Sequence, residues 1–291
     1  MTTHQVVFLN GDFIPANEAV VPILDRGFML GDGVYEVIPA FGGQLFRLPE
    51  HLKRLDRSLD AIRIPNPMSE ADWQQVLKDL VTRNGGGDLS LYLQVTRGVA
   101  SKRDHAFPDT VIPTVLAMCT PAPPVPDNTI EQIGVGAITR PDIRWDRCDI
   151  KAITLLANVL LRQEAHDAGA YECILIREGF AWEGAASNLF IVQNGVLITP
   201  PKGAWLLPGI TRDLVLELAD EHGFPYREDT ISESMLADAD EIWLTSSTRD
   251  ILPVTRLNDQ PVGDGKPGPR WRTMRGIFLA YKQSVRNSAA V

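Results

Sequence analysis

The chain has 291 residues, of which 44% are hydrophobic and 22% are charged, as is usual for a globular protein. This length suffices for two packed domains or one large domain. The formal net charge of -9 leaves no basic surplus to neutralise phosphates, so the composition argues against nonspecific nucleic-acid binding.

Neither a membrane segment nor a secretory signal is expected. No apolar run approaches the roughly 20 residues that span a bilayer, and the first ten residues lack the pattern of a signal peptide. The three cysteines, Cys119, Cys148 and Cys173, are odd in number and widely spaced. They fit neither a disulfide framework nor a zinc site, and they suit a reducing compartment. We therefore expect a cytoplasmic protein without a bound metal.

The N-terminal part of the chain predicts strands together with amphipathic helices. Asn10-Gly11-Asp12 is a hairpin signal, and Ser69 is suited to cap a helix. Apolar residues at helical spacing predict helices over 49–62 and 69–83. Strands are expected at 6–9, 13–15, 34–41, 89–96 and 111–119.

Prolines gather in one segment, where four of the nine residues from Thr120 to Asn128 are proline. Such a composition predicts a linker between domains. We expect a smaller α+β domain at 1–119, the linker at 120–128, and a larger domain at 129–291.

The larger domain is predicted to mix helices and strands. Asn194-Gly195 marks a hairpin turn within it. Helices are expected at 153–168, 213–221 and 271–284. Strands are expected at 130–139, 171–176, 188–192, 196–199 and 241–245.

One lysine, Lys151, ends the segment Arg144-Trp145-Asp146-Arg147-Cys148-Asp149-Ile150-Lys151. A lysine held against a sheet or in a pocket loses its proton more readily, and the neutral amine can condense with a carbonyl as a Schiff base. Taken alone, an ordinary surface lysine is the simpler interpretation. Two later motifs favour catalysis: Glu183-Gly184-Ala185-Ala186-Ser187-Asn188 and Leu207-Pro208-Gly209-Ile210-Thr211-Arg212.

A third motif, Arg26-Gly27-Phe28-Met29-Leu30-Gly31-Asp32-Gly33-Val34-Tyr35-Glu36, precedes them. In this order the motifs resemble the fold-type IV pyridoxal-phosphate enzymes, the group of branched-chain and D-amino acid aminotransferases. The resemblance runs from about Val6 to Tyr281. It implies an enzyme of mixed α+β and α/β class, with two domains and pyridoxal 5'-phosphate in the cleft between them.

The resemblance implies roles for two catalytic groups. Lys151 matches the Schiff-base lysine, which also acts as a general base at Cα. Glu183 matches the glutamate that holds the pyridine nitrogen protonated and so strengthens the ring as an electron acceptor. Ala185 and Ala186 stand where many relatives have serines, a departure that implies fewer hydrogen bonds around the cofactor.

The resemblance also implies the remaining cofactor contacts. Arg54 matches an arginine that clamps the phosphate, for which a planar, permanently charged guanidinium is well suited. Ile210 and Thr211 precede a predicted helix whose first N–H groups would bind an anion, although Thr211 could simply cap that helix. Further contacts are implied for Ser187, Asn188, Leu207, Ser246 and Ser247.

A cation-rich loop at 97–108 separates the subfamilies. Arg103 and His105 stand where D-amino acid aminotransferases carry an Arg-x-His pair for the substrate α-carboxylate, together with a tyrosine that matches Tyr35. An arginine fork, a histidine and a phenol supply converging donors for one carboxylate, whereas the alternative is a solvated loop. Branched-chain aminotransferases lack this pair in this loop.

The implied reaction is transamination between D-amino acids and 2-oxo acids, in which D-alanine and 2-oxoglutarate give pyruvate and D-glutamate. The usual unit of the family is a homodimer in which the loop with Arg103 and His105 reaches the partner's active site. Alternatives on the same fold are a branched-chain L-amino acid aminotransferase, an (R)-amine transaminase and a 4-amino-4-deoxychorismate lyase. A non-catalytic carrier of the cofactor, or a small-molecule binding protein, is the alternative from another class, but it would not need Glu183.

Overall fold

The computed structural model describes residues 5–122 and 132–287, which divide into two compact units. Within the described residues, unit 1 comprises 5–122, 150–154 and 284–287, and unit 2 comprises 132–149 and 155–283. Lys151 therefore belongs to unit 1, although the segments on either side of 150–154 belong to unit 2. Most of the linker expected at 120–128 lies outside the described residues.

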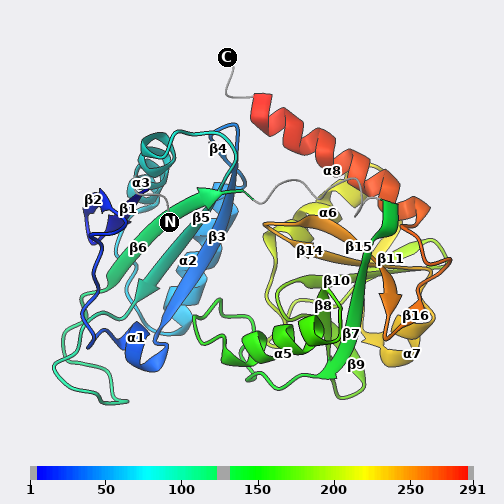
Figure 1. Cartoon of the computed structure of the whole chain (residues 1–291), viewed down its shortest axis with the longest axis horizontal. Coiled ribbons are helices and arrows are strands. Elements are labelled where there is room, and N and C mark those ends of the chain that lie inside the picture. The colour runs from blue at the N-terminus through cyan, green and yellow to red at the C-terminus, as the bar shows by residue number, and fades with distance from the viewer. Residues whose placement is uncertain (1–4, 123–131, 288–291) are drawn as a thin grey trace. The chain divides into compact units, whose positions relative to one another are not determined.

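Unit 1 is built on a six-stranded sheet in the order β2-β1-β6-β5-β3-β4, in which all pairings are antiparallel. Helix α2 (Leu48–Ala61) lies against β3, and α3 (Glu70–Arg83) lies against β1 and β6 (Figure 1). A short helix, α1 (Arg26–Leu30), precedes β3. The strands are β1 (Val6–Leu9), β2 (Asp12–Pro15), β3 (Gly33–Phe41), β4 (Gln44–Leu45), β5 (Leu89–Thr96) and β6 (Thr114–Pro121).

The local signals in unit 1 are confirmed. Ser69 caps α3 through a capping box, in which its Oγ accepts from the Asp72 N–H at 3.2 Å and the Asp72 carboxylate accepts from the Ser69 N–H at 3.3 Å. The leucines of α2 are buried in the core of the unit. Strand β6 begins at Thr114, later than predicted, directly after Pro113, which has no N–H to pair.

Unit 2 is built on a ten-stranded mixed sheet. The path β10-β14-β15-β7-β8-β9 returns to its start because β9 also pairs with β10, so six strands form a closed circuit. The closing pair joins Asn188 to Glu183. The strands are β7 (Val135–Pro141), β8 (Glu172–Arg177), β9 (Phe180–Gly184), β10 (Asn188–Gln193), β11 (Val196–Thr199), β12 (Tyr226–Glu228), β13 (Ile231–Ser232), β14 (Glu241–Ser246), β15 (Asp250–Leu257) and β16 (Gln260–Pro261).

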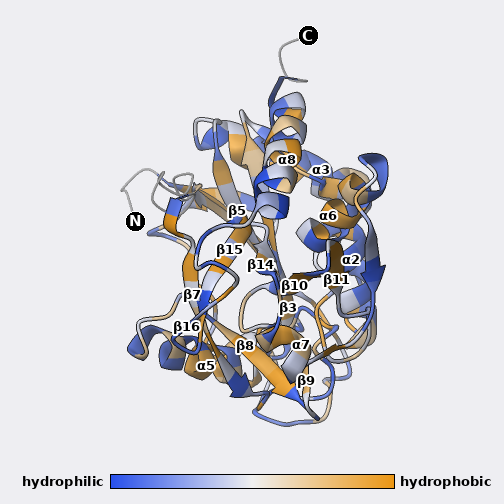
Figure 2. Ribbon diagram, turned by 90° about the vertical axis from the view of Figure 1, so that its right-hand side faces the viewer, coloured by the Kyte–Doolittle hydropathy of each residue, from blue (hydrophilic) through white to orange (hydrophobic). Residues whose placement is uncertain are grey.

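The core of unit 2 follows the continuous apolar runs of its central strands. Figure 2 shows β8 in orange, the colour of hydrophobic residues, and β10 is buried along nearly its whole length. Such runs are typical of strands covered on both faces. The helices are α5 (Leu156–Asp167), α6 (Ile210–Glu221), α7 (Glu233–Ala237) and α8 (Pro269–Asn287). None of the helices in the described part of the chain has the length and apolar character needed to cross a membrane.

Candidate active site

The residues expected to form a site are divided between the two units. Unit 1 carries Tyr35, Arg54, Arg103, His105 and Lys151. Unit 2 carries Glu183, Ser187, Asn188, Leu207, Ile210, Thr211, Ser246 and Ser247.

In unit 1, Lys151 is fixed along β3. Its carbonyl accepts from the Tyr35 N–H at 2.9 Å, and the Ile153 N–H donates to the Gly33 carbonyl at 3.1 Å. The Lys151 N–H donates to Oγ of Ser58 on α2 at 3.3 Å. Its side-chain Nζ lies 4.1 Å from the centroid of the Tyr35 ring, and no carboxylate among the described residues forms an ion pair with it. The amine is thus held on an aromatic face, without a charged partner there.

A buried ion pair joins Arg54 on α2 to Glu36 on β3. Arg54 donates from Nε to Oε1 and from Nη2 to Oε2 of Glu36, each at 2.7 Å, and His51 Nδ1 lies 2.8 Å from the same Oε2. Burial alone would raise the pKa of Glu36, but Arg54 and His51 hold it well below its usual range. Burial also lowers the pKa of His51, against the effect of Glu36. The predicted phosphate ligand Arg54 is thereby oriented before any ligand binds.

Neither Glu36 nor His51 is expected from the sequence to belong to the site, although the sequence carries a signal for one of them. Glu36 shares a face of β3 with Val34 and Ile38, both fully buried, so a carboxylate at that position requires a buried partner. His51 precedes Arg54 by three residues and therefore lies on the same side of α2.

Arg103 and His105 lie in the loop between β5 and β6 of unit 1. Both side chains are exposed, and within residues 5–122 and 132–287 neither makes a hydrogen bond or ion pair. They are therefore available to an incoming carboxylate.

In unit 2, Glu183 on β9 is 4% exposed and accepts from three donors. Arg144 Nη1 donates to its Oε1 at 2.5 Å, while the Leu207 N–H and Asn188 Nδ2 donate to its Oε2 at 3.0 and 3.1 Å. Burial raises the pKa of Glu183 to about 7, and Arg144 acts in the opposite direction. Glu183, the predicted partner of the pyridine nitrogen, is therefore a buried carboxylate held in place by three hydrogen-bond donors.

Arg144 was not assigned from the sequence, yet it connects Glu183 to a second carboxylate. Its Nε and Nη2 donate to Oδ1 and Oδ2 of Asp142 at 2.9 and 3.0 Å. Burial lowers the pKa of Arg144, but Glu183 and Asp142 together raise it above its usual range. Arg177 also pairs with Asp142, at 3.2 Å. Glu183 thus lies at one end of a chain of alternating charges, followed by Arg144, Asp142 and Arg177.

Asn188 sets the position of the segment that precedes α6. Its Nδ2 donates to the Leu207 carbonyl at 2.7 Å, and a Cβ added to Gly209 would lie 1.9 Å from its Oδ1. Only glycine tolerates so close an approach at this position. The approach of Asn188 therefore requires glycine at position 209.

Helix α6 begins at Ile210, three residues earlier than predicted, and Gly209 rather than Thr211 is its N-cap. The first N–H groups of a helix have no partner within it, so they are free to bind an anion. Ile210 and Thr211, both buried, supply the first two of these groups.

The three serines predicted to contact the cofactor differ in their surroundings. The Ser187 hydroxyl donates to Glu172 Oε2 at 3.0 Å, and burial raises the pKa of Glu172. Ser246 ends β14 and Ser247 follows it, both partly exposed. Beside them, the buried Thr245 hydroxyl has no hydrogen-bond partner among the described residues.

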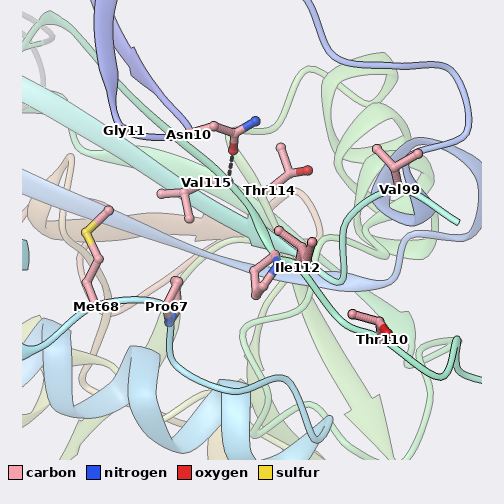
Figure 3. A pocket seen from close by; sticks show the side chains of 10 residues that line it. Asn10, Gly11, Pro67, Met68, Val99, Thr110, Ile112, Thr114 and Val115 are labelled. Carbon is pink, nitrogen blue, oxygen red and sulfur yellow. Dashed lines mark hydrogen bonds between the residues drawn. The ribbon is translucent and has the colours of Figure 1, made fainter.

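A pocket of about 630 Å³ in unit 1 is lined by other residues (Figure 3). No charged side chain and no predicted site residue lines it. The Asn10 side chain at its edge accepts from the Val115 N–H at 2.8 Å. Its walls include Met68, Val99, Ile112 and Pro113.

Comparisons with solved structures support the fold. The T.th. branched-chain amino acid aminotransferase solved with pyridoxamine 5'-phosphate is 26% identical with a TM-score of 0.92, and the match covers 98% of this chain and 96% of that one. The branched-chain amino acid aminotransferase from Escherichia coli is 27% identical with a TM-score of 0.86, over 95% and 93% of the two chains. The prediction of a fold-type IV architecture is confirmed.

Sequence comparisons identify relatives of higher identity. A D-alanine aminotransferase of Bacillus licheniformis is 44% identical over 284 residues, which are 98% of each chain. A D-alanine aminotransferase of Staphylococcus haemolyticus is 37% identical over 96% of this chain and 98% of its own. The family model for amino-transferase class IV matches residues 33–257. The chain therefore belongs to the class IV aminotransferase family.

Proposed function

We propose that this chain is a pyridoxal-phosphate-dependent D-amino acid aminotransferase, which converts D-alanine and 2-oxoglutarate to pyruvate and D-glutamate. The observation that carries the substrate class is the 44% identity to a D-alanine aminotransferase over 98% of both chains. As a class IV aminotransferase, the chain takes amino acids and 2-oxo acids as substrates.

The described residues fit pyridoxal phosphate in three respects. Arg54 and the N–H groups at the start of α6 suit the phosphate. Glu183 is a buried carboxylate, as the pyridine nitrogen requires. The third is the buried hydroxyl of Thr245, which has no hydrogen-bond partner among the described residues. It lies on the strand that ends at Ser246. We assign further contacts to Ser187, Asn188, Leu207, Ser246 and Ser247.

When bound, pyridoxal phosphate supplies an electron sink that weakens the bonds at the substrate Cα. Lys151 provides the amine that attaches the cofactor and, once displaced, the base that removes and returns the Cα proton. The Tyr35 ring and the pairing with β3 keep that amine in place. Arg144 and the Leu207 N–H favour the carboxylate form of Glu183, which then holds a proton on the pyridine nitrogen.

We assign the α-carboxylate of the substrate to Tyr35, Arg103 and His105. A carboxylate bound by these donors decides which face of the substrate Cα is presented to Lys151, and thereby favours D-amino acids. A carboxylate trap would be superfluous for an (R)-amine transaminase.

We further propose that two copies form a homodimer, in which the loop with Arg103 and His105 reaches the active site of the partner. Each unit exposes apolar side chains, which supports the proposal that a second copy covers them. In unit 2 the exposed residues of α5 include Leu156 and Val159. In unit 1, Val20, Ile23 and Phe28 are each more than three quarters exposed.

We place the domain boundary at the proline-rich segment 120–128, and the division into units falls after Ala122.

We propose a cytoplasmic location, which three free, buried cysteines support. Burial raises the pKa of each of these thiols, so that none is an activated thiol.

The proposal is tested by supplying D-alanine or L-leucine with 2-oxoglutarate to the purified protein with its cofactor. We expect pyruvate from D-alanine, little turnover of L-leucine, and a strong reduction in the Arg103→Ala variant. Turnover of L-leucine instead would make the chain a branched-chain aminotransferase. Release of pyruvate from 4-amino-4-deoxychorismate without an amino acceptor would make it a lyase.

A further inference from the structure

The loop that carries Arg103 and His105 is held by a buried arginine. Arg26, the first residue of α1, is 4% exposed. Its Nη1 donates to the carbonyls of Asp104 and Ala106 at 2.6 and 3.1 Å, and its Nη2 donates to the carbonyl of His105 at 3.3 Å. One guanidinium thus binds three consecutive carbonyls of the loop, while the side chains of Arg103 and His105 remain exposed.

Arg26 is fixed in turn by Asp32. Its Nε donates to Asp32 Oδ2 at 2.8 Å, and Arg97 donates to the same carboxylate from Nε at 2.8 Å and from Nη2 at 2.9 Å. Burial alone would raise the pKa of Asp32, but its bonds to Arg97 and Arg26 lower it. Asp32 is therefore ionised at neutral pH and holds both arginines.

Arg97 connects this group to the other end of the loop. Its guanidinium carbon lies 3.6 Å from the centroid of the Phe107 ring, while its nitrogens donate to the carbonyls of Ile62 and Arg63 beyond the end of α2. The base of the loop is closed by Gly98, where a Cβ would lie 1.9 Å from the Ile112 carbonyl oxygen. The loop is thus attached at its base, at its carbonyls and at Phe107.

We propose that Arg26, Asp32 and Arg97 are positioning residues, which fix the loop so that Arg103 and His105 meet the substrate carboxylate. The inference rests on the proposed function, in which these two side chains bind that group. Displacement of a binding group by about 1 Å can cost up to about 10²-fold in rate, so the attachment of the loop sets the affinity for carboxylate substrates. Among the described residues, the side chains of all three make their hydrogen bonds to the loop, to one another or to the end of α2.

Two variants test the proposal. Phe107→Ala removes an exposed ring and its contacts with Arg97 and Arg63. Arg26→Lys keeps the charge beside Asp32 but loses the fork that binds three carbonyls. In both we expect the KM for D-alanine and for 2-oxoglutarate to rise about tenfold or more, with the absorbance of the bound cofactor unchanged. Hydrogen exchange of the amides at 103–107 should become faster.

Phe13→Ala is a control for the loss of an arginine–ring contact, because Arg83 lies over the Phe13 ring at 4.4 Å elsewhere in unit 1, although that ring also packs against the core. It should leave both KM values and the exchange at 103–107 unchanged. Phe107→Tyr keeps an aromatic face for Arg97 and should restore the KM lost in Phe107→Ala.

An unchanged exchange rate at 103–107 would contradict the attachment itself. Faster exchange with an unchanged KM would contradict its role in carboxylate binding. If the parent enzyme does not act on D-alanine, the proposed function fails, and hydrogen exchange still decides whether Arg26 and Phe107 hold the loop.

Discussion

Lys151 and Tyr35 are joined twice: the Tyr35 N–H donates to the Lys151 carbonyl at 2.9 Å, and Lys151 Nζ lies 4.1 Å from the centroid of the Tyr35 ring. A single backbone pairing therefore fixes the positions of two groups. These are the amine proposed to attach the cofactor and the phenol proposed to bind the substrate carboxylate. A shift of the 150–154 segment along β3 would displace the two groups relative to each other.

Replacing Lys151 by alanine should lower the rate of transamination by about 10²–10⁴-fold, because the base at Cα is lost. Borohydride reduction of the parent protein with its cofactor should attach the cofactor to the peptide that contains residue 151. Lys53→Ala, on the exposed side of α2, is the control and should behave as the parent. Labelling of another lysine would contradict the assignment.

Tyr35→Phe keeps the ring beneath Lys151 and removes only the hydroxyl. We expect an unchanged cofactor absorbance and a KM for D-alanine raised about 2- to 12-fold, as for the loss of one hydrogen bond of about 0.5–1.5 kcal/mol. Tyr35→Ala should in addition disturb the absorbance, since the ring is lost. Equal KM values in Tyr35→Phe and the parent would remove the phenol from the carboxylate site.

Gly209→Ala should destabilise the protein by about 1–3 kcal/mol and weaken cofactor binding, because the added Cβ would lie 1.9 Å from Asn188 Oδ1. Gly203→Ala is the matched control, since nothing lies within 4 Å of a Cβ at that position. Denaturant unfolding and cofactor titration of both variants make the measurement. Equal stability of the two variants would show that the start of α6 can move.

Glu36→Gln should destabilise the protein by about 3–5 kcal/mol, because it leaves Arg54 buried beside a neutral partner. Glu50→Gln, which weakens the more exposed pair with Arg47 on the same helix, should cost less than about 1 kcal/mol. Thermal unfolding compares the two. Added phosphate should recover part of the loss in Glu36→Gln if Arg54 binds phosphate.

Glu183 should make the free energy of unfolding of the cofactor-free protein depend on pH. Its pKa is about 7 in the folded chain against 4.5 for the ordinary side chain, so the folded state binds the extra proton between these values. The free energy of unfolding should therefore fall as the pH rises from about 4.5 to 7, by about 1.4 kcal/mol per pH unit. Urea unfolding at pH 5 and pH 8 measures this slope, which Glu183→Gln should flatten. An equal slope in both proteins would contradict it.

Much of the fold could be predicted from periodicity and capping. The leucines of α2 and the Ser69 cap of α3 are local signals, which the structure confirms. Boundaries depend on contacts that a local pattern does not contain. Helix α6, for example, begins at Ile210 with Gly209 as its N-cap, and Asn188 on β10 leaves no room for a Cβ at that position.

The charged partners could not be predicted in the same way. Arg144 meets Glu183 across 39 residues, and Arg26 reaches the Asp104 carbonyl across 78. A single sequence shows that these arginines are charged but not which acceptor each one meets. Only Glu36 carried a readable signal, as a carboxylate between buried apolar positions of one strand.

The most direct test is a single turnover without an amino acceptor, in which the cofactor-loaded protein is mixed with D-alanine or with L-alanine. We expect D-alanine to change the absorbance of the bound cofactor and to release one pyruvate per chain, and L-alanine to do neither. Pyruvate from L-alanine, or no change with D-alanine, would contradict the assignment of this chain to D-amino acid transamination.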